Sequence, residues 1–251
     1  MLAAQRRDLL LARLNADGRL VAKDLAAELG VSEDSLRRDL RELATAGLCQ
    51  RVYGGALPLS PAVASYAARG SVSPMSKRRV AAAAVALLRP GSTVLLDGGT
   101  TALAVATALP RDLTATIVTH SPTVAAALVE HPTVEVYVLG GRLFKHSAVT
   151  CGAAAAEAAA GVQADLFLLG VTGVHPTAGL TTGDADEAAM KRIMAGRAAD
   201  TYVLASREKI GAASPYTVLP LHAVSGVITD AQRDLPVLEE LRQAGVTVLE
   251  A

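Results

Sequence analysis

The 251-residue sequence is poor in aromatic residues, which make up only 3% of it, and it has no tryptophan. Its two cysteines, Cys49 and Cys151, are too few for a disulfide framework and lie in no metal-ligand pattern, so we expect no metal and no cofactor. The formal net charge of zero excludes a general electrostatic attraction to nucleic acid. Apolar runs are short, since VAAAAVALL after Arg79 is flanked by charge and cannot span a membrane. With no signal-peptide pattern either, we expect a cytoplasmic protein without a membrane partner.

Alanine, valine and leucine are abundant, and hydrophobic residues make up 51% of the chain. After residue 76, apolar segments alternate with alanine-rich helical patterns, which indicates a parallel sheet covered by helices on both faces. We therefore predict a Rossmann-like α/β domain with a mostly parallel sheet, whose ligand site lies in the loops that follow the strands. The predicted strands are residues 93–97, 115–119, 134–139, 165–170, 201–205, 224–229 and 246–249.

The N-terminal part of the chain predicts a helix-turn-helix module. Residues 5–15 have the pattern of a first helix, Gly30 ends a second one, and Ser32 is a good N-cap for the third. Residues 48–57 then form a hairpin broken by a Gly-Gly pair, the arrangement called a wing. In the third helix, leucines at spacings of four and three face inward: Leu36, Leu40 and Leu43.

The outer face of that third helix, residues 32–45, suits the major groove of DNA because it carries arginines. Residues 1–57 contain nine Lys/Arg against eight Asp/Glu, so local placement rather than overall charge must provide the binding. A module this small and nearly neutral is expected to act as a homo-oligomer on repeated half-sites of double-stranded operator DNA. The arginines placed to bind are Arg37, Arg38, Arg41 and Arg51.

Composition divides the chain into three parts. We expect the winged helix-turn-helix domain in residues 1–57 and a linker rich in Pro, Ser and Ala in residues 58–75. The α/β domain then occupies residues 76–251.

The first candidate site loop follows the first predicted strand of the α/β domain. Its glycines let backbone amides approach an anion, its threonines add hydroxyl donors, and the helix after it offers a positive N-terminus. The loop matches neither a Walker motif nor GxGxxG. The alternative is a plain strand-to-helix turn. The predicted anion-binding residues are Asp97, Gly98, Gly99, Thr100 and Thr101.

Two further loops carry polar residues with open interpretations. His120 either touches a ligand or is structural, and Ser121 either joins it or caps the next helix. Arg142 or Lys145, after a Gly-Gly pair, either meets a phosphate or belongs to a solvated basic turn.

The fourth loop begins at Gly170 and leads to a cluster of charges at the start of a later helix. Asp184 and Glu187 are suited to accept hydroxyls of a polyol ligand, while Lys191 balances their charge. The alternative is a surface ion pair, since Glu187 and Lys191 are four residues apart. Lys209 follows a later strand and is placed to reach the same mouth.

Together these motifs resemble the DeoR family of bacterial transcriptional regulators over nearly the whole chain. The N-terminal part matches through Arg7, the leucines, SEDSLRRDL ending at Leu40, and RVYGGA. The C-terminal part matches through LLDGGTT, VTHS, LGGR, LGVTGV, GLTTGDADEAAMKR and the region of Lys209. Two unrelated motif sets in the expected order and spacing make the resemblance specific.

The resemblance implies a repressor of sugar-metabolism genes whose effector is a phosphorylated sugar, bound by a domain similar to sugar-phosphate isomerases. It implies a phosphate loop at residues 98–101, polar groups facing the sugar at Asp184 and Glu187, and cations at Lys191 and Lys209. The DNA contacts it implies, with the wing Tyr53 beside them, are Ser32, Ser35, Arg37, Arg38 and Arg51.

Some positions depart from the family pattern. Ser35 stands for the usual Thr, Tyr53 for the common His of the wing, and Gly183 for a common Pro. His120 replaces a common Asn and is the change expected to alter ligand choice most.

Two other functions compete with this prediction. The first is a sugar-phosphate isomerase with an N-terminal appendage, in which Asp184 and Glu187 act as general base and acid. The attached DNA module argues against it, so we predict that the protein is not an enzyme. The second is a DNA-binding protein with a ligand-free C-terminal domain, against which the DGGTT loop, Asp184, Glu187 and Lys191 argue.

Overall fold

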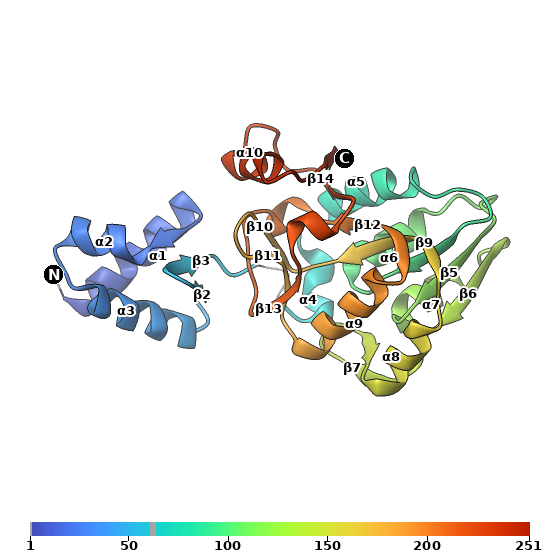
Figure 1. The fold of residues 1–251 in the computed structure, drawn as a ribbon, viewed down its shortest axis with the longest axis horizontal. Coiled ribbons are helices and arrows are strands. Elements are labelled where there is room, and N and C mark those ends of the chain that lie inside the picture. The colour runs from blue at the N-terminus through green and yellow to red at the C-terminus, as the bar shows by residue number, and fades with distance from the viewer. Residues whose placement is uncertain (1, 61–63) are drawn as a thin grey trace.

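The computed structural model describes residues 2–60 and 64–251. Residue 1 of the predicted DNA-binding domain and residues 61–63 of the predicted linker lie outside them. Figure 1 shows a small N-terminal domain set apart from a larger α/β domain. The N-terminal elements are α1 (Ala3–Asp17), β1 (Leu20–Val21), α2 (Ala22–Leu29), α3 (Glu33–Thr45), β2 (Gln50–Val52) and β3 (Gly55–Leu57).

The N-terminal domain is the predicted winged helix-turn-helix. Ser32 caps α3, because its Oγ accepts a hydrogen bond from the Ser35 N–H at 3.2 Å. The inward leucines of α3 are buried with Leu10 of α1 and Leu25 of α2 in one apolar cluster. The sheet has the order β1-β3-β2, so a short strand before α2, absent from the prediction, pairs Leu20 with Ala56 of the wing.

Two ion pairs fix α1 against α3. Arg6 pairs with Asp39, which is only 3% exposed, and Arg7 pairs with Glu42 nearer the surface. The buried carboxylate of Asp39 needs this partner, since an unpaired charge in the core is costly. The face of α3 that lies against α1 is therefore fixed, and its opposite face is left for other contacts.

The α/β domain is built on a seven-stranded sheet in which every neighbouring pair is parallel, as predicted. All seven predicted strands are present in it, with ends shifted by up to three residues. In spatial order they are β15 (Val248–Glu250), β14 (Gly226–Thr229), β12 (Ala198–Leu204), β9 (Ala164–Gly170), β4 (Thr93–Leu96), β5 (Ala115–Thr119) and β6 (Val134–Val138).

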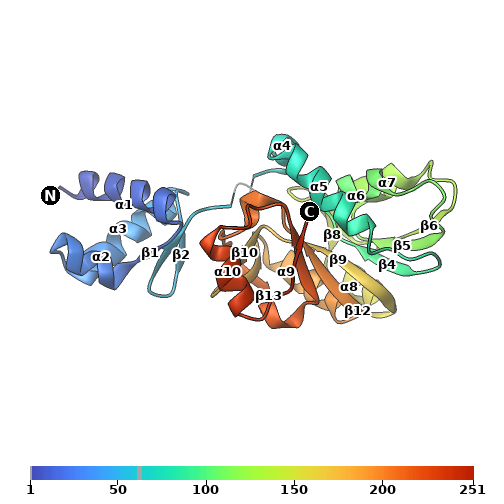
Figure 2. The same cartoon turned by 90° about the horizontal axis from the view of Figure 1, so that it is seen from above.

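Helices cover both faces of this sheet (Figure 2). Successive residues of β4 point to opposite sides, so Val94 and Leu96 pack in one apolar cluster and Leu95 in the other. The first cluster contains side chains of α5 (Pro74–Val85), α6 (Thr100–Ala108) and α7 (Pro122–Leu128). The second contains side chains of α8 (Ala153–Ala160), α9 (Ala185–Ala195) and α10 (Pro236–Gln243).

The chain order reverses next to β4. From β4 the chain adds β5 and β6 on one side, and then returns to place β9 on the other. In open α/β sheets, ligands bind at the carboxyl ends of the strands at such a switch point. The loops after β4 and β9 are therefore the expected walls of a site.

Several short elements were not predicted. A small antiparallel sheet contains β10 (Gly173–His175), β11 (Gly179–Thr182) and β13 (Tyr216–Leu219), and a separate hairpin contains β7 (Arg142–Phe144) and β8 (Val149–Cys151). The predicted linker contains a helix, α4 (Tyr66–Ser71), and the first residues of α5. Most of these strands are only three residues long and three of them are buried throughout, so they show no alternation of apolar and polar residues.

Candidate functional site

A polar cavity lies at the switch point, between the carboxyl ends of β4 and β9. The loop 98–101 forms one wall and residues 170–172 form another. Gly99 is the N-cap of α6 with a φ of 98°, a left-handed conformation that favours glycine. The charged residues lining the cavity are Arg69, Lys77, Glu187, Lys191, Glu208 and Lys209.

The carboxylate of Asp97 contacts four groups next to this cavity, which come from the loops after β4 and β5, from the end of β9 and from helix α9. It is completely buried at the end of β4. Its Oδ1 lies 2.7 Å from His120 Nε2 and accepts a hydrogen bond from the Gly98 N–H at 2.7 Å. Its Oδ2 accepts hydrogen bonds from Lys191 Nζ at 2.6 Å and from the Gly170 N–H at 2.8 Å. Both oxygens therefore face protein groups rather than the cavity.

Opposite charges keep this buried pair ionised. Burial alone would raise the pKa of Asp97, but Lys191 and His120 hold it well below its usual range. Burial would likewise lower the pKa of Lys191, but the attraction of Asp97 and Glu187 outweighs burial and raises it. The cavity thus has a permanent cation at Lys191, fixed in place by Asp97.

Lys209 is a second lysine that lines the cavity, but it loses its proton more easily than Lys191. Its Nζ donates to Thr101 Oγ1 at 3.2 Å and to the Leu204 carbonyl oxygen at 3.0 Å. Burial, together with Lys77, Arg69 and Lys191, lowers the pKa of Lys209 to about 7, although Glu208 opposes the shift. An anion beside Lys209 would favour its protonated form, so binding of an anion near neutral pH is coupled to uptake of a proton.

The structure brings eight of the predicted ligand residues to the cavity. These come from the loop after β4, the end of β9, helix α9 and the short 3-10 helix Arg207–Lys209. They are Gly98, Gly99, Thr100, Thr101, Gly170, Glu187, Lys191 and Lys209.

The other predicted ligand residues do not line the cavity. One of them is Asp97, described above. His120 is fully buried, with its Nδ1 2.9 Å from the Thr150 carbonyl oxygen. Ser121 caps α7, and Asp184 caps α9 by accepting a hydrogen bond from the Glu187 N–H at 3.0 Å. Arg142 is exposed and pairs with Asp186 at 3.1 Å. His120 and Ser121 thus match the structural alternatives that the sequence left open, and Asp184 is a helix cap. Arg142 lies on strand β7 rather than in a turn.

Some lining residues were missed from the sequence. Lys77 lies three, four and seven residues before Val80, Ala81 and Ala84, so it shares their buried face of α5. A lysine among these apolar positions is the sequence signal that could have identified it. Arg69 lies in the segment expected to be a linker, where no pattern pointed to a site.

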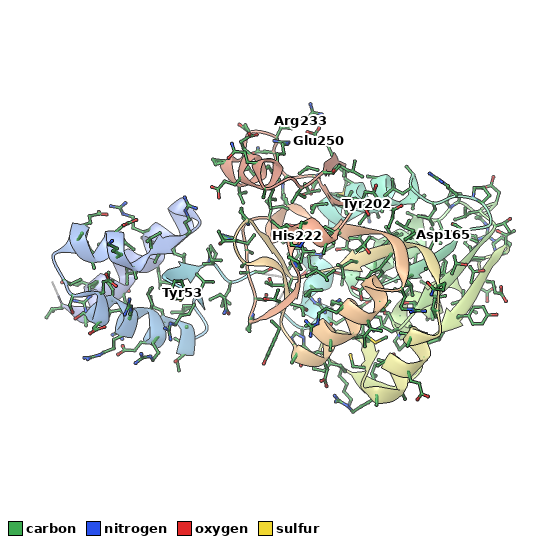
Figure 3. All side chains as sticks on the ribbon, viewed as in Figure 1. Tyr53, Asp165, Tyr202, His222, Arg233 and Glu250 are labelled. Carbon is green, nitrogen blue, oxygen red and sulfur yellow. The ribbon has the colours of Figure 1, made fainter. Side chains whose placement is uncertain are left out.

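The predicted DNA-binding residues all lie on α3 or on the wing, or cap α3. A hollow between α3 and the wing is lined by Arg37, Arg51 and Tyr53, and Tyr53, labelled in Figure 3, is fully exposed. Arg37 is held by Glu33 at 2.7 Å and by Asp34 at 3.8 Å.

The remaining predicted contacts lie next to this hollow. Arg38 and Arg41 are exposed on α3, and neither side chain pairs with a carboxylate within the described residues. Ser32 and Ser35 share a hydrogen bond of 3.0 Å between their hydroxyls at the start of α3. On α3, Arg38 and Arg41 therefore make no ion pair within the described residues, whereas Arg37 would have to leave its partners to contact DNA.

A winged helix-turn-helix joined to an α/β domain with a cationic cavity defines a DNA-binding regulator with a sensor domain. The model for the DeoR-like helix-turn-helix domain matches residues 6–61, and that for the DeoR C terminal sensor domain matches residues 73–231. The chain belongs to the DeoR family of transcriptional regulators, as its motifs predicted. None of the helices in the described residues has both the length and the hydrophobicity that a membrane span needs.

Relatives match along almost their whole length. The HTH-type transcriptional regulator GlpR of Haloferax volcanii is 36% identical, over 100% of this chain and 98% of that protein. The HTH-type transcriptional repressor GlcR of Bacillus subtilis is 29% identical, over 94% of this chain and 92% of that protein. The glycerol-3-phosphate regulon repressor of Escherichia coli K12 is 28% identical, over 96% of each chain.

Proposed function

We propose that this regulator is a repressor of sugar-metabolism genes whose affinity for operator DNA is controlled by a phosphorylated sugar in the switch-point cavity. The observation that carries the proposal is the loop 98–101. It leads into the N-terminus of α6, where the N-cap Gly99 makes no side-chain hydrogen bond to the first N–H groups, and Lys209 Nζ lies 3.2 Å from Thr101 Oγ1. Amides, a helix N-terminus and a cation together suit a phosphate group.

The cavity also offers an acceptor for hydroxyl groups. Glu187 is buried, and its Oε2 accepts a hydrogen bond from Thr182 Oγ1 at 3.5 Å, a weak contact that a stronger donor can replace. A ligand that carries both a phosphate and hydroxyl groups suits these two kinds of lining group. The name of the Escherichia coli relative, glycerol-3-phosphate regulon repressor, supports this class of ligand.

We further propose that the DNA-binding domain is residues 1–57 and that the effector domain follows in residues 76–251, with α4 packed against it. The protein would bind double-stranded operator DNA as a homo-oligomer in the cytoplasm, because one small module makes too few contacts for tight binding. DNA contacts are assigned to Ser32, Ser35, Arg37, Arg38, Arg41, Arg51 and Tyr53.

The cavity is proposed to bind its ligand without converting it. Asp184, which the isomerase alternative needs as a base, is the N-cap of α9 and lies outside the cavity lining. Incubation with pentose and hexose phosphates should therefore show no isomerisation. Turnover that is lost in Glu187→Gln would instead favour an enzyme.

A thermal-shift panel tests the ligand class. Each common sugar phosphate, including glycerol 3-phosphate, is paired with its unphosphorylated parent. Ligand at a hundred times its Kd stabilises the folded protein by about 2.7 kcal/mol, which raises Tm by roughly 5–10 °C for a domain of this size. We expect a rise with one phosphorylated compound and none with its parent. Equal rises with both, or no rise with any phosphate, would contradict the proposal.

A further inference from the structure

Helix α4 brings an arginine from between the two domains into the cavity. Arg69 lines the cavity beside the loop 98–101, since a Cβ atom built on Gly99 would lie 3.9 Å from Arg69 Nη1. The two family models match residues 6–61 and 73–231, so Arg69 belongs to the connection between them. A residue of the connection therefore stands at the wall where a phosphate is proposed to bind.

The guanidinium of Arg69 has one N–H donor, at Nε, that makes no hydrogen bond within the described residues. Nη2 donates to the His146 carbonyl oxygen at 3.4 Å, whereas Nε is buried and has no hydrogen-bond partner among the described residues. Burial lowers the pKa of Arg69, although the negative charge of Glu187 opposes this. A desolvated guanidinium with an unused donor favours an anion, because its planar fork matches carboxylate and phosphate oxygens.

Hydrogen bonds to neighbouring elements hold α4 against the effector domain. Lys77 Nζ donates to the carbonyl oxygen of Arg69 itself. The N–H of Tyr66 donates to the His146 carbonyl oxygen at 2.9 Å, and the Tyr66 hydroxyl donates to Thr123 Oγ1 at 2.9 Å. A ligand contact at Arg69 would therefore add to the contacts that decide where α4 lies.

The same connection leads directly to the wing. Strand β3 ends at Leu57, and Leu59 forms a parallel bridge with Ala213. The next residue, Ser214, shares a hydroxyl hydrogen bond of 2.7 Å with Thr172, which lines the cavity. Leu59 therefore contacts a segment next to the cavity wall, so the connection contacts the effector domain both just after the wing and at α4.

We propose that Arg69 binds the anionic group of the ligand and so couples occupancy of the cavity to the position of the DNA-binding domain. This inference rests on the function proposed above and names its coupling residue. The ligand class is a small phosphorylated polyol. A contact made in only one position of α4 favours that position, and only such a difference between states can shift DNA affinity.

Arg69→Gln tests the coupling, with Arg78→Gln, an exposed arginine of α5, as the matched control. For the full chain, the Kd for operator DNA is measured with and without the phosphorylated sugar that raises wild-type Tm most. We expect Arg69→Gln to bind this sugar about tenfold more weakly. At saturating sugar, the ratio of the two operator Kd values should approach one in Arg69→Gln and keep its wild-type value in Arg78→Gln. A wild-type ratio in Arg69→Gln at saturation would overturn the proposal.

Hydrogen exchange of the wild-type protein gives a second readout that needs no variant to fold. The ligand should slow exchange of the amides in residues 66–72. If the ligand raises Tm but leaves this exchange unchanged, the role of Arg69 is wrong and the proposed function stands. If exchange slows but the wild-type operator Kd does not change, the proposed function and the coupling both fail, and only the contact to Arg69 remains.

Discussion

Asp97→Ala is expected to lower the free energy of unfolding of the α/β domain by about 3–5 kcal/mol, the cost of leaving one partner of a buried ion pair without the other. The substitution leaves the buried ammonium of Lys191 without its ion-pair partner. It also removes the acceptor for the N–H groups of Gly98 and Gly170, which hold the ends of β4 and β9 together. The effect is large because one carboxylate satisfies all of these groups.

Thermal unfolding of the full chain, followed by circular dichroism, measures this effect. A loss of this size lowers Tm by about 10 °C for a domain of 150–250 residues. Asp186→Ala is the control, because its pair with Arg142 is exposed on both sides and should contribute less than about 1 kcal/mol. Equal Tm values for Asp97→Ala and Asp186→Ala would show that the Asp97 network does not support the domain.

Arg38→Ala is expected to weaken operator binding by about 1–3 kcal/mol per DNA-bound module, the loss typical of a bidentate contact to a base. Arg38 is exposed on α3 and makes no ion pair within the described residues, so it needs no rearrangement to reach DNA. Arg37→Ala should cost less, since Arg37 must first give up Glu33 and Asp34.

Fluorescence anisotropy with a labelled DNA fragment, selected by the protein from a random library, measures these losses. Arg111→Ala, an exposed arginine in the loop between α6 and β5, is the control and should bind as the wild type does. If Arg38→Ala binds with the wild-type Kd while its fold is intact, the recognition surface lies elsewhere on the N-terminal domain.

The parallel sheet was predictable because each of its strands shows a local signal. The central strands are apolar on both faces, as in Val94, Leu95 and Leu96, and a helix-forming segment lies between most successive strands of the sheet. The helix-turn-helix was predictable for a similar reason, since leucine spacing and the Ser32 cap lie within a few residues of each other. The elements that were missed, such as α4 and β10, are too short to show a period.

The site was predictable only in part, because a loop sequence does not state where its side chains point. The loop 98–101 was found from its glycines and threonines, and it does line the cavity. Asp97 directly before it turns inward to Lys191, a partner 94 residues away. Asp184 carries the same chemistry as Glu187, but it caps a helix while Glu187 faces the cavity. Such differences arise from packing between distant segments, which local patterns do not contain.

The central claim is that a phosphorylated sugar in the switch-point cavity controls binding to DNA. It is tested most directly by titrating the operator-bound, full-length protein with the phosphorylated sugar that raises Tm and, in parallel, with its unphosphorylated parent. The account predicts that the phosphorylated sugar changes the operator affinity at concentrations that fill the cavity, while the parent sugar has no effect. Operator affinity that stays constant when the cavity is saturated would contradict it.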